Sequence, residues 1–278
     1  MFMVTSASVT QLPPTNSVFL SAGYTAEYIR VGSGDPIVIV PGMAGGIALL
    51  QPLIDQLSQT NEVIAYQLRG ENQGLFDRGF GFDRLVNDLG ELMRALRLER
   101  PGLLGVSFGG TIALSYAARH PAELAYVAVQ GVGASFRLGM IGDVARAVLN
   151  RLPLPDDSPF LNQIFQVLLG TPARPGDQFD FVVNRCWQTD QSVMAHRMTM
   201  LEDCDVGGHL DEVTTPALVF GCDHDIIASV DQSRTLADRV ARGRFEHLEE
   251  AGHLAFVTHP ERVASCVHEF GRHCQKAA

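Results

Sequence analysis

The sequence predicts an α/β fold in which helices cover both faces of a mostly parallel central sheet. Two observations lead to this expectation. Short apolar runs bounded by glycine or proline alternate with longer segments of helical periodicity along most of the chain. The chain also has 278 residues, of which 46% are hydrophobic, so it can bury one large core. We therefore expect one enzyme-sized domain with an insertion rather than two separate domains.

The runs that predict buried strands are rich in valine, isoleucine and leucine. They are PIVIV (36–40), EVIAYQL (62–68), GLLGV (102–106), AYVAVQG (125–131), ALVFG (217–221) and FEHLE (245–249). Segment 82–96 instead places apolar side chains three and four residues apart, which predicts a helix with one apolar face that packs on the sheet. Because right-handed crossovers join parallel strands in such folds, functional groups are expected at the carboxyl ends of the strands.

The alternation of strands and helices covers only part of the chain. Residues 1–16 end in QLPPTN and have the composition of a loose N-terminal tail. The alternation breaks again over residues 134–210, which are helical in pattern, rich in Met, Phe and Leu, and interrupted by proline. We interpret this segment as an inserted helical cap. The core domain then comprises residues 17–133 and 211–278.

Composition excludes several classes of function. The 21 basic and 31 acidic residues give a formal charge of -10, which repels nucleic-acid phosphates and anionic lipid surfaces. The five cysteines include no C-x-x-C pair of the kind that binds zinc or exchanges disulfides. The sequence has neither a recognisable signal peptide nor an apolar run of membrane-spanning length. The expectation is a cytoplasmic protein without a nucleic-acid partner or a membrane span.

The most informative motif is GVSFGG at positions 105–110. It continues directly from the apolar run PGLLG, which ends at Gly105, and directly precedes the helical pattern TIALSYAARH. A serine on a sharp strand-to-helix turn has a strained backbone, and glycines two residues before and after it let neighbouring segments approach. The hydroxyl is then exposed, and the positive end of the following helix favours an oxyanion beside it. This context predicts that Ser107 is a nucleophile.

A serine nucleophile needs a base within hydrogen-bond distance, and the base needs a carboxylate that holds its tautomer. The segments GCDHDIIASVDQSRTLADRV and EEAGHLAFVTHPERV follow GVSFGG in that order. In these three segments and their order, the chain resembles the α/β-hydrolase fold family, in its serine-esterase branch, from about residue 17 to the C-terminus. The resemblance implies that Ser107 attacks, that His253 moves the proton and that Asp225 orients the histidine. It implies no cofactor and no metal ion.

Two other residues compete for the roles of acid and base. Asp223 follows the same strand as Asp225, but its simpler interpretation is a capping or turn residue. We prefer Asp225 because the stretch that begins there resembles the turn and helix that follow this strand in the family. His259 directly precedes Pro260 and is typical of a residue at the entry of a helix. No aspartate directly follows the strand at 125–131, so the family's less common position for the acid is empty.

Two backbone N–H groups are expected to stabilise the tetrahedral oxyanion. The resemblance assigns them to Phe108, which follows the nucleophile, and to Met43, in the loop after PIVIV. That loop begins with Pro41 and Gly42 where the family usually has His-Gly, and a plain strand-to-helix turn explains its glycines as well. Gln67 stands before Leu-Arg-Gly where the family often has aspartate, and we interpret this change as a structural one.

Several apolar residues of the cap segment are candidates for the wall of an acyl pocket, and core packing explains each one equally well. They are Met140, Phe160, Phe165, Trp187 and Met194. Trp187 is the chain's single tryptophan and lies in its least regular region, so it is the candidate for substrate binding.

The leading hypothesis is hydrolysis of a small carboxylic ester or related acyl compound through an acyl-enzyme. The same triad serves C–C bond hydrolysis, enol-lactone opening and acyl transfer, and the fold does not choose among them. Ser107 excludes the dehalogenases and epoxide hydrolases of the family, which need an aspartate nucleophile at this position. A hypothesis from another class is a ligand receptor that keeps the triad and turns over slowly.

Overall fold

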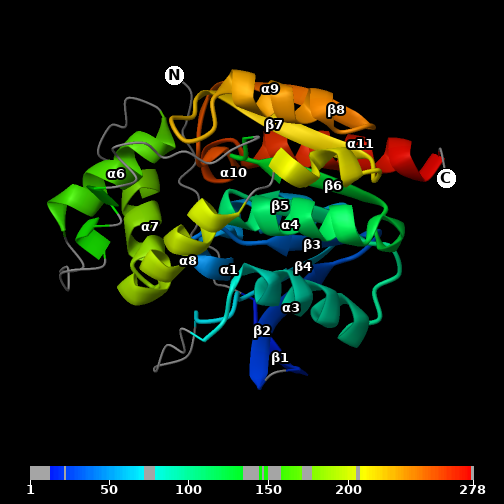
Figure 1. The fold of residues 1–278 in the computed structure, drawn as a ribbon, viewed down its shortest axis with the longest axis horizontal. Coiled ribbons are helices and arrows are strands. Elements are labelled where there is room, and N and C mark those ends of the chain that lie inside the picture. Colours follow the sequence, from blue (N-terminus) through cyan, green and yellow to red (C-terminus); the bar gives the residue numbers. More distant parts are fainter. Residues whose placement is uncertain are drawn as a thin grey trace, which may run out of the picture.

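The computed structural model describes residues 13–21, 23–71, 79–133, 144–145, 147–149, 158–170, 177–204 and 207–276. Within these residues the chain forms one eight-stranded sheet of order β1-β2-β4-β3-β5-β6-β7-β8 (Figure 1). The strands are β1 (Asn16–Leu20), β2 (Tyr24–Gly32), β3 (Pro36–Val40), β4 (Glu62–Tyr66), β5 (Gly102–Val106), β6 (Tyr126–Gln130), β7 (Ala217–His224) and β8 (Gly243–Gly252). β2 pairs antiparallel with β1 and β4, and the neighbouring pairs from β4 to β8 are parallel.

Helices follow most of the strands. They are α1 (Gly46–Leu49), α2 (Gln51–Leu57), α3 (Phe82–Ala95), α4 (Phe108–Arg119), α6 (Pro159–Leu169), α7 (Asp177–Cys186), α8 (Gln191–Asp203), α9 (Val230–Arg239), α10 (Ala255–Thr258) and α11 (Pro260–Lys276), with short 3₁₀ helices at Pro121–Glu123 and Gly207–Glu212. The sheet and its helices confirm the α/β fold that the sequence predicts.

The two faces of the sheet bury alternate residues of each central strand. In β3, Ile37 and Ile39 belong to the apolar core under α2 and α11, whereas Val38 and Val40 belong to the core under α3 and α4. Figure 1 shows α3, α4 and α9 in front of the sheet and α11 behind it. Strands that are buried on both faces explain why the sequence shows them as continuous apolar runs.

The structure contains all six predicted strands and adds two, and β6 is one residue shorter at each end than its apolar run. β3 and β5 have the predicted bounds, β4 ends at Tyr66, and β7 and β8 run longer than their apolar runs. β1 and β2 were not predicted, because this antiparallel pair at the edge of the sheet mixes exposed and buried residues. Residues 1–12 of the predicted tail lie outside the described residues, and β1 begins at Asn16.

The helices α6, α7 and α8 lie together at one end of the sheet, on the left of Figure 1. They come from the segment that the sequence assigns to the cap, of which residues 134–143, 146, 150–157, 171–176 and 205–206 lie outside the described residues. The boundaries of cap and core stay a prediction.

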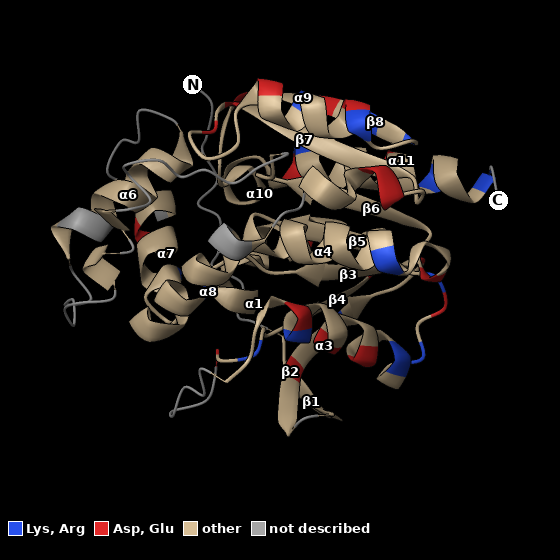
Figure 2. Cartoon of the chain, viewed as in Figure 1, with Lys and Arg blue, Asp and Glu red and all other residues tan. Residues whose placement is uncertain are grey.

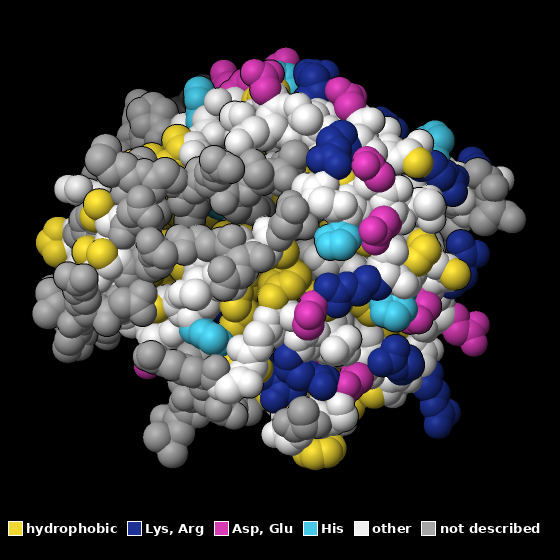
Figure 3. Space-filling model, viewed as in Figure 1, with side chains coloured by type: hydrophobic (Ala, Val, Ile, Leu, Met, Phe, Trp, Pro, Cys, Tyr) yellow, Lys and Arg dark blue, Asp and Glu magenta, His cyan; other side chains and the backbone are white. Residues whose placement is uncertain are grey.

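Charged residues gather on the helices that cover the sheet. α3 and α9 carry both signs, whereas α6 carries no charged residue (Figure 2). On the face shown in Figure 3, blue and magenta side chains are mixed rather than separated by sign. None of the described helices is both long and apolar enough to cross a lipid bilayer.

Candidate active site

Ser107 lies between β5 and α4 with backbone angles that few residues other than glycine adopt. Its φ is 51° and its ψ is -121°, which strains a backbone that carries a Cβ. The glycines on either side are required by close contacts. A Cβ on Gly105 would lie 2.5 Å from the Gly109 carbonyl oxygen, and one on Gly109 would lie 2.2 Å from the Val40 carbonyl oxygen. The start of α4 therefore packs against β5 and the end of β3 only because these positions lack side chains.

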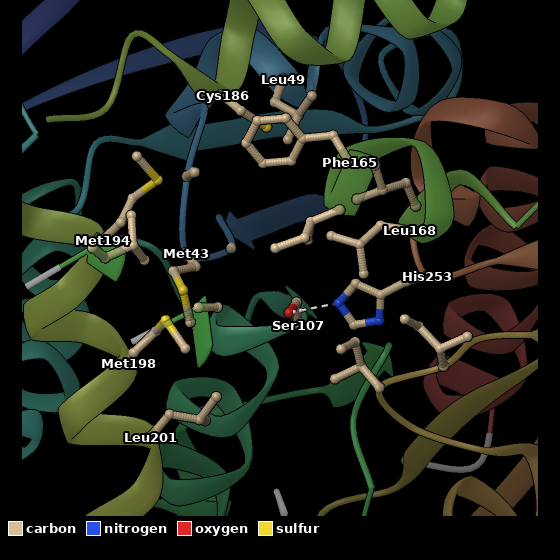
Figure 4. Close-up of a pocket in the computed structure, with 18 of the residues that line it drawn as sticks. Met43, Leu49, Ser107, Phe165, Leu168, Cys186, Met194, Met198, Leu201 and His253 are labelled. Atoms are coloured by element: carbon tan, nitrogen blue, oxygen red, sulfur yellow. Dashed lines mark hydrogen bonds between the residues drawn. The ribbon is translucent and has the colours of Figure 1, made fainter. Parts of the chain in front are cut away.

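His253 connects Ser107 to Asp225. Its Nε2 lies 2.8 Å from Ser107 Oγ, a hydrogen bond drawn as a dashed line in Figure 4. Its Nδ1 lies 3.0 Å from each carboxylate oxygen of Asp225. Both residues are buried, His253 with 4% and Asp225 with 7% of its surface exposed. The structure thus brings together a hydroxyl, an imidazole and a carboxylate from the three segments that the sequence singles out.

Asp225 is held by its own loop as well as by His253. Its Oδ1 accepts hydrogen bonds from the backbone N–H groups of Ile227 at 2.8 Å and Ala228 at 2.9 Å. Burial by itself raises the pKa of this carboxyl group. The charge of His253, together with the hydrogen bonds from His253 and the loop, outweighs burial and lowers the pKa of Asp225 below its usual value. Asp225 is therefore ionised at neutral pH and can stabilise a positive charge on the imidazole.

Asp223 and His259, the other candidates for acid and base, bond to other groups. Asp223 is bonded to His247, with 2.6 Å between Oδ1 and Nε2, and its other oxygen accepts the Glu250 N–H at 3.2 Å. About a third of the Asp223 side chain is exposed, 36% by area. His259 precedes α11, where its carbonyl accepts the Val263 N–H at 3.1 Å. Asp223 thus closes a turn at the surface and His259 begins a helix.

The loop after β3 reaches Ser107. A Cβ on Gly42 would lie 3.5 Å from the Val106 carbonyl oxygen and 3.7 Å from Ser107 Cβ, so the loop runs directly against the serine turn. Met43 follows Gly42, and both line the same cavity as Ser107. Phe108 is fully buried and begins α4. The two residues expected to serve the oxyanion are therefore adjacent to Ser107, one in the neighbouring loop and one next in the chain.

Gln67 supports the helix that follows this loop. Its Oε1 accepts a hydrogen bond from the Ile47 N–H at 3.1 Å, at the start of α1. A Cβ on Gly46 would lie 2.0 Å from the same oxygen, so the side chain lies flat against the Gly46 backbone. The glutamine at this position makes a structural contact of the type the sequence suggests.

Ser107 and His253 border an apolar cavity of about 170 Å³. An apolar cavity of roughly 150 Å³ holds one benzene molecule, so there is space for a group of that size. α6 lines it with Ile164, Phe165 and Leu168, and α8 lines it with Met194, Met198 and Leu201 (Figure 4). Cys186 also lines it, but burial raises the pKa of this thiol to about 12, so the thiol is protonated at neutral pH.

The apolar candidates of the cap segment have different places. Phe165 and Met194 line the cavity. Trp187 is not among the lining residues: its ring meets Phe165 edge to face at 6.3 Å, and its Nε1–H donates to Asn162 Oδ1 at 3.3 Å. It therefore lies behind the cavity wall, because Phe165 occupies the position nearer to the cavity. Met140 and the side chain of Phe160 lie outside the described residues.

The sequence profile of the alpha/beta hydrolase family matches residues 37–265, from the second residue of β3 through β8, and this range includes all three residues of the hydrogen-bonded line. The chain belongs to the alpha/beta hydrolase family. This hydrolase is 33% identical to the 2-hydroxy-6-oxo-2,4-heptadienoate hydrolase of Pseudomonas putida over 125 residues, which are 43% of the chain and 45% of that relative.

Two further proteins are similar over nearly the whole hydrolase. The 2-hydroxymuconate semialdehyde hydrolase of Pseudomonas sp. strain CF600 is 25% identical over 282 residues, covering 96% of the chain and 97% of that protein. An esterase from Exiguobacterium antarcticum superposes with a TM-score of 0.81 and 19% identity, covering 92% of the chain and 98% of the esterase. At that identity the superposition shows the fold alone.

The structure of the hydrolase adds two residues at the end of β6 that the sequence did not single out. The Gln130 carbonyl accepts the Ser107 N–H at 2.8 Å, and its side-chain Nε2–H donates to the His253 carbonyl at 2.9 Å. Gly131 follows with a φ of 70°, and a Cβ there would lie 2.8 Å from His253 Cε1. The sequence placed both residues at the carboxyl end of the strand candidate AYVAVQG, and it gave no other sign of their contacts.

α6 contacts the loop that carries His253. The Leu254 N–H donates to the Leu168 carbonyl at 3.1 Å. Gly170, which ends α6 with a φ of 74°, lies so close that a Cβ there would be 2.4 Å from the Gly252 Cα. The end of α6 thus rests on backbone directly before and after His253.

Proposed function

We propose that the protein is a serine hydrolase that cleaves a small, uncharged carboxylic ester through an acyl-enzyme. The observation that supports this most is the hydrogen-bonded line of Ser107, His253 and Asp225, in which 2.8 Å and 3.0 Å separate successive partners. In this proposal the helices of segment 134–210 form a cap over the site, and the apolar cavity beneath them takes the acyl group.

The reaction proceeds in two balanced steps. In the first, Ser107 Oγ attacks the ester carbonyl while His253 Nε2 takes the hydroxyl proton. The tetrahedral intermediate then breaks its bond to the alcohol oxygen, which leaves with that proton. In the second, a water molecule gives its proton to His253 and attacks the acyl-enzyme, so that the carboxylic acid is released and the proton returns to Ser107. Asp225 stabilises the imidazolium in both steps.

The oxyanion of each tetrahedral intermediate is stabilised by the backbone N–H groups of Met43 and Phe108. The helix that begins at Phe108 contributes the positive end of its dipole at the same place. The support for this assignment is that the Gly42–Met43 loop runs against the serine turn and lines the same cavity as Ser107.

The lining of the cavity supports an uncharged acyl group. Apart from Ser107 and His253, the described lining residues are glycine, aliphatic and aromatic residues, methionine and one cysteine, with no lysine or arginine among them. A carboxylate that enters such a lining loses its hydration without gaining a charged partner. Aliphatic or aromatic acyl groups of small esters instead make apolar contacts with the lining residues.

A second candidate is hydrolysis of a C–C bond by the same triad, and the supporting observation is the likeness to the dienoate and semialdehyde hydrolases. Enol-lactone opening and acyl transfer use the same groups. Product analysis separates them: the ester hydrolase releases an alcohol and an acid, whereas the C–C hydrolase releases two fragments of one carbon skeleton.

A panel of p-nitrophenyl esters with short and aromatic acyl groups tests the proposal on wild type and Ser107→Ala. We expect turnover by wild type and a loss of at least about 10³-fold in kcat for the variant. A fluorophosphonate probe should label wild type at Ser107 and leave the variant unlabelled. Equal rates in the two proteins would refute the mechanism, and a folded wild type that binds ligands without labelling or turnover would favour the receptor.

A further inference from the structure

The loop that carries Met43 is held from outside by two side chains of the cap segment. The Gly45 N–H donates to Thr189 Oγ1 at 2.8 Å, just before α8 begins. Arg197, in the second turn of α8, donates from Nη1 to the Met43 carbonyl oxygen at 2.8 Å. Residues more than a hundred positions away in sequence therefore fix both the middle and the end of this short loop.

Glu71, in the turn after β4, joins these two side chains. One of its carboxylate oxygens accepts a hydrogen bond from the Thr189 hydroxyl, and the other lies 2.7 Å from Arg197 Nη1. The Arg197 side chain is 1% exposed and that of Glu71 is 4% exposed. A closed circuit results, in which Met43, Arg197, Glu71, Thr189 and Gly45 are joined in turn. We refer to Glu71, Thr189 and Arg197 as the loop clamp.

Stability alone does not account for the burial of the ion pair between Arg197 and Glu71. Removing a guanidinium and a carboxylate from water carries a large desolvation penalty, and apolar residues of the same volume often give an equally stable core. Arg197 further donates from Nη2 to the carbonyl oxygens of Leu68 at 3.5 Å and Arg69 at 3.3 Å. Arg197 Nη1 and Nη2 thus donate to backbone carbonyls of two loops, whereas its Nε is buried with no hydrogen-bond partner among the described residues. The bonds from the two Nη atoms restrict the conformation of both loops, Met43 included.

α8 has a second role, because its neighbouring face lines the cavity. Met194, Met198 and Leu201 of α8 border the cavity, and Arg197 lies within the same turns of the helix. A single helix therefore forms the wall against the substrate and holds the loop beside Ser107. The position of that wall and the position of the Met43 loop are set together.

We propose that Glu71, Thr189 and Arg197 are positioning residues that hold the Met43 N–H in the place where it stabilises the oxyanion. This inference rests on the proposed function of the site. The clamp does not touch the substrate and acts through the loop. Loss of the clamp should therefore destabilise the tetrahedral transition state more than the bound ester in its ground state.

The test begins with Thr189→Val, which keeps the volume, deletes the hydroxyl and leaves no charge without a partner. Removal of a direct oxyanion donor costs about 10²–10³-fold in kcat, so for the indirect change we expect a loss of roughly tenfold in kcat with KM within about twofold. The inhibition constant of a trifluoromethyl ketone, which forms a tetrahedral adduct with the serine, should rise by a similar factor. Thr189→Ser, which keeps the hydroxyl, should restore both values.

Thr199→Val is the matched control, since Thr199 is an exposed threonine on the same helix whose hydroxyl donates to the Ala195 carbonyl in its own turn. We expect it to leave kcat unchanged. Glu71→Gln provides a second route, because it removes the charge that Arg197 faces while keeping an oxygen for Thr189. We expect a loss of several-fold in kcat with the same parallel rise in the inhibition constant.

Rates are normalised to the number of active sites, counted from the end point of fluorophosphonate labelling. The inference is overturned if Thr189→Val or Glu71→Gln, whichever folds, keeps kcat and the inhibition constant within about twofold of wild type. It is also overturned if kcat falls while the inhibition constant stays fixed. These results differ from a failure of the proposed function, in which Ser107→Ala itself keeps the wild-type rate.

Discussion

Gln130 donates a hydrogen bond from its side-chain amide to the His253 carbonyl at 2.9 Å while its own carbonyl accepts the Ser107 N–H at 2.8 Å. One residue at the end of β6 therefore touches the backbone of both the serine and the histidine. Gln130 is fully buried, and β6 is hydrogen-bonded to a strand on each side. Gln130 therefore fixes the distance between Ser107 and His253 from a rigid part of the sheet.

Replacement of Gln130 by methionine should lower both stability and activity. The variant leaves the His253 carbonyl without this donor, which costs about 1–3 kcal/mol. It also removes Gln130 Oε1, a buried acceptor with no partner among the described residues, so we expect the net loss at the low end of that range. Urea denaturation and kcat measure the two effects. Gln163→Met, on the exposed surface of α6, is the control and should change neither.

Gly131→Ala should displace the imidazole. A Cβ at this position would lie 2.8 Å from His253 Cε1 and 3.0 Å from Nδ1. A misplacement of about 1 Å can cost roughly 10²-fold in rate, so we expect kcat to fall by about that factor.

Gly23→Ala controls for backbone strain in the Gly131 experiment. Both glycines have a φ of 70°, but a Cβ at Gly23 would meet nothing within 4 Å. Both variants should lose about 1–2 kcal/mol of stability from an alanine in the left-handed region. If Gly23→Ala loses as much kcat as Gly131→Ala, contact with the histidine is not the cause.

Asp225→Asn should abolish most of the activity while Asp223→Asn keeps it. An asparagine at 225 no longer stabilises the imidazolium and can hold the wrong tautomer, for which a loss of about 10⁴-fold in kcat is known in a serine protease triad. Asp223 faces His247 and the turn at Glu250 rather than His253. Steady-state kinetics on the two variants decide the assignment, and a reversed order of activities would transfer the role of acid to Asp223.

The lowered pKa of Asp225 predicts how stability changes with pH. Because the folded-state pKa lies below the unfolded value of about 3.9, the ionised carboxylate contributes stability that is fully present above that value. The contribution is lost as the pH falls through the folded-state pKa. The difference in unfolding free energy between wild type and Asp225→Asn should therefore shrink from about pH 6 to about pH 3. Urea titrations at both pH values measure it, and a difference that grows towards acid would contradict the prediction.

Phe165→Ala should enlarge the cavity and change the preference for acyl groups. Phe165 is 7% exposed and lines the cavity, so its truncation should raise kcat/KM for bulky relative to short acyl groups and cost about 3 kcal/mol of stability. Trp187→Phe, one layer further back, should leave the preference between short and bulky esters unchanged. If Trp187→Phe changes the acyl preference and Phe165→Ala does not, Trp187 rather than Phe165 contacts the substrate.

The parts of the fold that the sequence predicts well are those with a strong local pattern. The strands buried on both faces appear as apolar runs, and the turn at Ser107 is marked by glycines that the structure requires for close contact. β1 and β2 lack such a pattern because only Leu20 of β1 is buried, and the alternation of buried and exposed residues in β2 breaks at Glu27 and Tyr28.

The parts of the site that escape prediction depend on contacts between distant segments. Nothing near Gln130 in the sequence shows that its amide meets the backbone of residue 253. Arg197 likewise resembles an ordinary charged residue of a helix until the fold buries it beside Glu71. The resemblance to a family assigns the residues of the hydrogen-bonded line, but the motifs that carry the resemblance include neither Gln130 nor Arg197.

The close approach of Gly170 and Gly252 limits how this pocket can be redesigned. A fragment of another enzyme grafted in place of α6 would need a glycine where the helix ends, because any larger residue there presses on backbone adjoining the histidine. Libraries that vary the pocket wall should therefore leave both positions untouched, and inactive clones from random mutagenesis should include substitutions at a site that no substrate reaches.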